Sequence, residues 1–119
     1  MAAIVRAAGA EPVATRAIAS LVSVIAGGVD RAIVDLTARA YDGVEAVAAA
    51  VAAGAAVLAV GQHDDVPTRR RALAAGATRV VPYRLLAAPA GPATVARWST
   101  AAGTTAGGPR AGAGTAGRP

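Results

Sequence analysis

The chain has 119 residues, 55% of them apolar, no cysteine and a formal net charge of +5 at neutral pH. This length allows at most one domain, and the lack of cysteine excludes a disulfide framework and a thiolate metal site, as suits a cytoplasmic protein. All twelve basic residues are arginines, and only Arg69, Arg70 and Arg71 are adjacent. The charge therefore favours a GC-rich coding bias over a nucleic-acid interface, which needs clustered arginines among aromatic residues.

The N-terminal quarter of the chain predicts two helices and one weak strand. Residues 4–8 read as a helix end, and residues 11–15 read as a strand whose Pro12 restricts it to a sheet edge. Apolar residues at helical spacing within 18–25 predict a second helix that ends at Gly27.

From residue 31 onward, short apolar runs alternate with helical patterns. The expected strands are residues 32–36, 55–60 and 79–82. Asp42 and Glu45 have the spacing of a helix cap, which predicts a helix that opens at this point. Asp64 or Asp65 is expected to cap the next helix, near Pro67.

Strands that alternate with helices predict an α/β fold, in which helices cover both faces of a mostly parallel sheet. A last short helix is expected over residues 91–98, anchored by Trp98, the only tryptophan. Residues 100–119 contain no Val, Ile, Leu or aromatic residue, so they cannot bury enough apolar surface to offset the entropy of ordering. We therefore expect one domain over residues 1–99 and a disordered tail over residues 100–119.

The order of these elements resembles a response-regulator receiver domain. The resemblance rests on the collinear series IVDL, DG, VLAVG and LAAGATRVV. Receivers carry a phosphoacceptor aspartate at the end of their third strand and an Asp-Gly pair seven and eight positions later, a spacing that Asp35, Asp42 and Gly43 share. The match covers residues 4–98 and is similar to a degenerate group from high-GC bacteria, in which a glycine, here Gly61, replaces the hydroxyl residue after the fourth strand.

The resemblance implies a flavodoxin-like three-layer sandwich that lacks its first strand. This strand carries the acidic pair of the family, and the chain is expected to begin inside the helix that follows it. Residues 11–15 would then either pair with the strand at 32–36 or hang loose, and in the second case they would leave an exposed sheet edge, which is liable to association.

The resemblance also implies a phosphorylation pocket that has lost most of its parts. Receivers hold Mg²⁺ with several carboxylates and neutralise the phosphoryl group with a lysine. In this chain Gly61 stands at the hydroxyl position, and Tyr83 and Arg84 stand where Lys-Pro is expected. One carboxylate is a poor Mg²⁺ site, so we expect Asp35 to be an inactive phosphoacceptor position, with no catalytic residue, metal or cofactor. The alternative is a functional two-component response regulator that is phosphorylated on Asp35 and uses Mg²⁺.

Other polar residues have simpler explanations. His63, Asp64 and Asp65 are expected to begin a helix, because three adjacent side chains do not converge on one metal ion without a bent loop. Thr37 is expected to have no base beside it, since the only histidine lies in another loop.

We expect a non-catalytic, receiver-like module for protein interaction or signalling. Receivers act through the face formed by their fourth and fifth strands and helices, and Arg and Tyr are enriched at binding hot spots. The partner-face candidates are Arg69, Arg70, Arg71, Tyr83 and Arg84.

The expected partner is a protein, and a homo-oligomer is compatible with the exposed sheet edge. No membrane partner is expected, because the longest uncharged run, residues 46–62, is too short and too rich in alanine to span a bilayer. Two further interpretations are weaker. An α/β ligand-binding or enzyme fragment would be supported by a phosphate-binding glycine loop after a strand, which the chain lacks, and a nucleic-acid binder would rest on charge alone.

Overall fold

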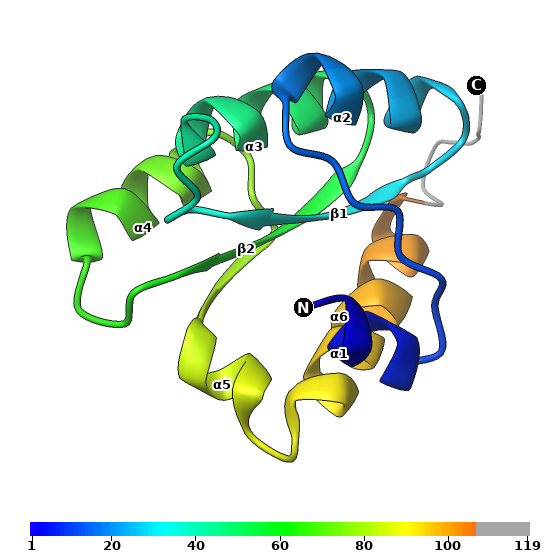
Figure 1. Ribbon diagram of the computed structural model, residues 1–119, viewed down its shortest axis with the longest axis vertical. Coiled ribbons are helices and arrows are strands. Elements are labelled where there is room, and N and C mark those ends of the chain that lie inside the picture. The colour runs from blue at the N-terminus through cyan, green and yellow to red at the C-terminus, as the bar shows by residue number, and fades with distance from the viewer. Residues whose placement is uncertain (107–119) are drawn as a thin grey trace.

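Three parallel strands form the centre of the computed structural model, which describes residues 1–106 of the chain (Figure 1). They are β1 (Arg31–Asp35), β2 (Ala56–Gly61) and β3 (Arg79–Pro82), in the order β1-β2-β3. The α/β class with a parallel sheet is thus confirmed, and the strands predicted at residues 32–36, 55–60 and 79–82 are confirmed to within one residue at each end. The central strand β2 is buried from Val57 to Gly61 because it has a neighbour on either side.

Helices cover both faces of the sheet, so the described part of the chain has three layers (Figure 1). The helices are α1 (Ala2–Ala7), α2 (Ile18–Ala26), α3 (Gly43–Ala52), α4 (Val66–Ala74), α5 (Tyr83–Ala87) and α6 (Gly91–Ala106). Helices α2, α3 and α4 lie on one face, and α1, α5 and α6 lie on the other. Because side chains alternate along a strand, β2 sends Val57 and Ala59 into one apolar cluster and Leu58 and Val60 into the other.

Short local signals define the starts and ends of α3 and α4. The Asp42 side chain accepts a hydrogen bond of 3.0 Å from the backbone N–H of Glu45, as predicted. Asp65, rather than Asp64, caps α4 by accepting a bond of 3.1 Å from the N–H of Thr68. After α4, Gly76 adopts φ +112°, and a Cβ there would lie 2.9 Å from a methyl group of Val51, so this turn requires glycine.

The predicted strand at residues 11–15 does not form. Residues 10–16 instead connect α1 on one face to α2 on the other and pass the outer edge of β1 on the way (Figure 1). Within the described residues, 11–16 make no backbone hydrogen bond to β1. Pro12 lacks an N–H to donate to a neighbouring strand, which weakens pairing of this segment with β1.

The C-terminal elements also differ from expectation. No helix was predicted at residues 83–87, where Pro82 ends the third strand and serves as the N-cap of the five-residue helix α5. Helix α6 continues to Ala106, past the expected domain boundary at residue 100, while residues 107–119 of the predicted tail lie outside the described residues.

Trp98 anchors α6, as predicted. Its side chain is buried against the face of the sheet that carries Leu58, and its Nε1 donates a hydrogen bond of 2.8 Å to Oγ1 of Thr78. That hydroxyl donates in turn to the carbonyl oxygen of Val57, also at 2.8 Å. The chain of bonds ties the last helix to the sheet. No helix among the described residues is long and apolar enough to cross a membrane.

Candidate functional site

The carboxyl ends of the three strands bring the residues of interest together at one end of the sheet. Asp35 ends β1, Gly61 ends β2, and Tyr83 follows the last residue of β3. The pairing of Asp35 with Val60 and of Gly61 with Pro82 sets these ends side by side. In open α/β sheets ligands bind outside the carboxyl ends of the strands, so this end of the sheet is the candidate site.

Thr37 holds the Asp35 side chain. The backbone N–H and the Oγ1 hydroxyl of Thr37 both donate to Oδ1 of Asp35, each at 2.8 Å. This is an Asx turn, in which an aspartate bonds to the backbone two residues later. Thr37 was expected to have no base beside it, because the only histidine lies in another loop. The structure shows that the carboxylate of Asp35, two residues away, accepts the hydrogen bond from its hydroxyl.

Both tyrosines of the chain lie close to Asp35. Burial raises the pKa of Tyr83, and hydrogen bonding with the Asp35 carboxylate adds to that rise. Burial also raises the pKa of Tyr41, against an opposing effect of its hydrogen bond with the Asp35 backbone. Both phenols thus stay protonated at neutral pH. Tyr83, a partner-face candidate, therefore lies beside Asp35 and away from the arginines of α4.

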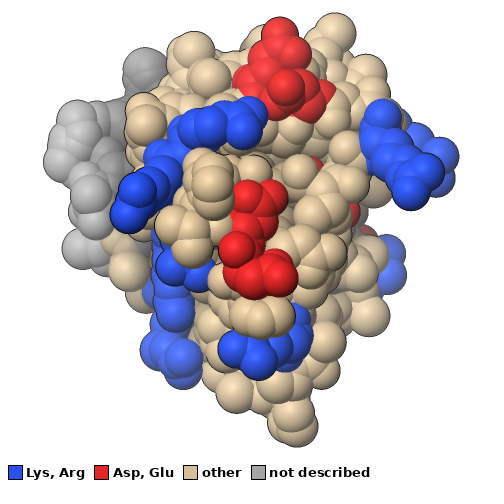
Figure 2. Space-filling view, turned by 90° about the vertical axis from the view of Figure 1, so that its left-hand side faces the viewer, with Lys and Arg blue, Asp and Glu red and all other residues tan. Residues whose placement is uncertain are grey.

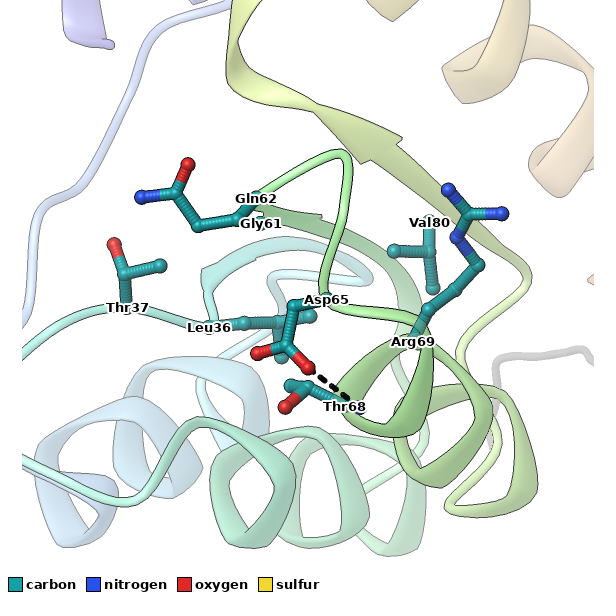
Figure 3. Close-up of a pocket in the computed structure, with 8 residues that line it drawn as sticks. All are labelled: Leu36, Thr37, Gly61, Gln62, Asp65, Thr68, Arg69 and Val80. Atoms are coloured by element: carbon teal, nitrogen blue, oxygen red, sulfur yellow. Dashed lines mark hydrogen bonds between the residues drawn. The ribbon is translucent and has the colours of Figure 1, made fainter.

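The space beside Gly61 is filled by Leu36 (Figure 3). A Cβ at position 61 would lie 3.2 Å from the Leu36 Cδ1 atom, so the leucine takes the room that a larger residue would need. A cavity of about 20 Å³ is left here, enough for about one water molecule. Asp35 does not line this cavity but borders a much larger groove on the other side of β1.

The loop before α4 serves the start of that helix. The hydrogen bonds from Thr68 hold the pKa of Asp65 below its usual range, which is the mark of a working N-cap. Arg69 donates from Nη2 to the carbonyl oxygen of His63 at 3.3 Å and so closes the loop. In the part of the chain that the structure describes, no three side chains of His, Cys, Asp or Glu gather where they could hold a metal ion.

The partner-face candidates do not form one patch. Arg70 and Arg71 are exposed on α4, and Arg84 is exposed on α5, which lies on the opposite face of the sheet. Figure 2 shows the side of the molecule next to α4, where arginines stand in separate groups around acidic residues. Separate positive groups of this kind suit a protein partner better than a continuous polyanion such as a nucleic acid.

Sequence reasoning identified Asp35, Gly61 and Tyr83 but missed Thr37 and Tyr41. The threonine had a signal, because Asp-x-Thr is a common local turn. Tyr41 had none, since its approach to Asp35 depends on the path of the loop between β1 and α3.

Comparisons with known proteins found no match among protein-family models, curated proteins or solved structures. Function is therefore inferred from the residues of this chain and their geometry.

Proposed function

We propose that this chain is a non-catalytic, receiver-like interaction module with a flavodoxin-like fold. In the doubly wound strand order 2-1-3-4-5, the third, fourth and fifth strands are neighbours. Strands β1, β2 and β3 are adjacent in the same sequence, with helices on both faces. Asp35, Gly61 and Tyr83 then stand at the ends of the third, fourth and fifth strands of the family, which supports the correspondence.

The surroundings of Asp35 carry the proposal. Phosphoryl transfer to a carboxylate needs a free oxygen for in-line attack, several anionic ligands for Mg²⁺ and a cation to neutralise the developing charge. Oδ1 of Asp35 already accepts two hydrogen bonds from Thr37, and the Tyr83 phenol lies close enough to the same carboxylate for the Asp35 charge to raise its pKa. Among the described residues, no cation forms an ion pair with Asp35. The site stabilises a loop and provides little for phosphorylation.

A receiver-like protein that is not phosphorylated acts through what it binds. The exposed arginines of α4 and α5 flank β3, and neither Arg70 nor Arg84 forms an ion pair within the described residues. Arginine contributes contact area and directed hydrogen bonds to interfaces, and a positive surface accelerates association with an acidic partner in a way that salt weakens. The proposed partner is a protein with an acidic surface.

This proposal is tested by a pull-down from a nuclease-treated lysate of a high-GC bacterium. The bait proteins are the wild type, the variant Arg70→Glu/Arg84→Glu, and the control variant Arg6→Glu/Arg97→Glu. The control makes the same change of net charge on α1 and α6. We expect one protein to be retained by the wild type and the control, to be absent from the first variant, and to elute as salt rises. Identical sets of captured proteins in all three lanes would contradict the proposal.

A further inference from the structure

The outer edge of β1 is open, and its direction follows from the hydrogen bonds at the two ends of the strand. The N–H of Ala56 donates to the carbonyl oxygen of Asp30, and the N–H of Leu36 donates to that of Val60. The even-numbered residues of this stretch thus point their backbone groups toward β2. Because consecutive residues of a strand alternate in this respect, the odd-numbered residues point theirs away from the sheet.

The outward residues of β1 are Arg31, Ile33 and Asp35. Within the described residues, the N–H and C=O groups of Ile33 have no hydrogen-bond partner. Tyr41 approaches the Asp35 backbone at the carboxyl end of this edge, so the free stretch centres on Ile33. Such an edge is a template for pairing with another strand.

Residues 10–16, here called the strap, cross this edge without closing it (Figure 1). A groove of about 1000 Å³ separates the strap from the strand, with apolar walls that include Leu21, Ile25, Ile33 and Trp98. Protein interiors are close-packed, so a groove of this size beside a strand leaves room for further protein atoms. The strap is weakly held: Val13 is 62% exposed, and Glu11 forms a single exposed ion pair with Arg6 at 3.6 Å. It is therefore free to move aside.

The sequence of β1, RAIVD, is self-complementary in charge, since Arg31 precedes Ile33 by two residues and Asp35 follows it by two. We propose that β1 pairs with β1 of a second copy of this chain, antiparallel, about a twofold axis at Ile33. This register sets Arg31 opposite Asp35 of the second copy on both sides of the axis, and opposite charges at such positions attract. It is the isologous contact that closed dimers use, and it joins two three-stranded sheets into one.

The charged side chains are available for this contact. Arg31 donates from Nε to the carbonyl oxygen of Ser99 and from Nη1 to Asp30, while its Nη2 makes no hydrogen bond within the described residues. Asp35 has no ion-pair partner in the same part of the chain. Each residue can therefore gain a partner across the axis and keep the contacts that position it. The proposed dimer uses a different surface from the arginines of α4 and α5.

Light scattering on the full chain and on Arg31→Asp and Asp35→Arg tests the pairing. The wild type is expected to be a dimer whose dissociation constant rises with salt. Each single variant sets two pairs of like charges opposite one another, so its dissociation constant should rise roughly tenfold or more. The double variant Arg31→Asp/Asp35→Arg restores both pairs with the charges exchanged, and it should return to the dimer.

Mixing the two single variants gives the sharpest result and also shows that both are folded. One variant then presents only acidic residues at these two positions and the other only basic ones, so native mass spectrometry should detect the heterodimer in preference to either homodimer. A wild type that is monomeric, or a dimer that neither single variant weakens, would overturn the proposal. Failure of the mixed variants to associate, with circular dichroism showing both to be folded, would overturn it as well.

Discussion

Residues 1–17 and the sheet with its helices are held in different ways. Helix α1 buries none of its residues, and it reaches the rest of the molecule through the half-buried Ile4 packed near α6. Strand β2, by contrast, has five consecutive buried residues and helices above and below it. Since local stability follows buried apolar contact, the sheet holds the fold together and the N-terminal segment is an attachment to it.

This difference explains where the candidate site and the open groove lie. Gly61 and Tyr83 belong to the firm part of the molecule, whereas Asp35 ends the strand that faces the loosely held segment. One wall of the groove is therefore rigid and the other is movable. A surface of this kind suits the proposed association with a second copy, because a movable wall can make room for an incoming strand.

The largest expected effect separates the two regions directly. Leu58 is fully buried in β2 and Val13 is 62% exposed in the strap. Leu58→Ala should lower the free energy of unfolding by about 2–5 kcal/mol through lost burial and a cavity, whereas Val13→Ala should change it by less than about 0.5 kcal/mol. Urea denaturation followed by circular dichroism measures both. Equal losses would show that the strap contributes to the core.

A smaller effect is expected at the contact between α6 and the sheet. The hydrogen bond from Trp98 to Thr78 is partly buried and should contribute about 0.5–1.5 kcal/mol to stability. A double-mutant cycle with Trp98→Phe and Thr78→Val separates this bond from the loss of ring volume, because the volume change is the same with either residue at position 78. A coupling energy near zero would place α6 among the loosely held parts.

The smallest effect concerns the pH dependence of the α4 cap. Because the pKa of Asp65 is lower in the folded state than its ordinary value of 3.8, its contribution to stability is fully present above that value and is lost as the pH falls through the lower folded value. Asn also caps helices well, so Asp65→Asn should match the wild type at neutral pH and lose less stability in acid. Urea midpoints measured from about pH 7 to about pH 3 test this. Parallel curves for the two proteins would contradict it.

The sequence predicted the elements that local chemistry determines. Apolar runs located all three strands, and the spacing of Asp42 and Glu45 located the start of α3. It failed where tertiary contacts decide the outcome: residues 11–15 have strand-like composition but pass the open edge of β1 without bonding to it. Helix α5 was missed because it has only five residues, too few for a periodic pattern.

The candidate site divides in the same way. The bond between Asp35 and Thr37 spans two residues, so the local sequence Asp-x-Thr is enough to encode it. The approach of Tyr83 to Asp35 joins the ends of two strands, β1 and β3, that are separated by β2 in the sheet. No local pattern encodes such a contact, so only the fold reveals it.

The inactivity of Asp35 as a phosphoacceptor is tested most directly by intact-mass measurement. The wild type and Asp35→Asn are incubated with acetyl phosphate and Mg²⁺, and a phosphorylatable receiver domain serves as the positive control. We predict that neither form of this chain gains the mass of a phosphoryl group while the control does. A labile adduct on the wild type that is absent from Asp35→Asn would contradict the proposal and establish a functional response regulator phosphorylated on Asp35.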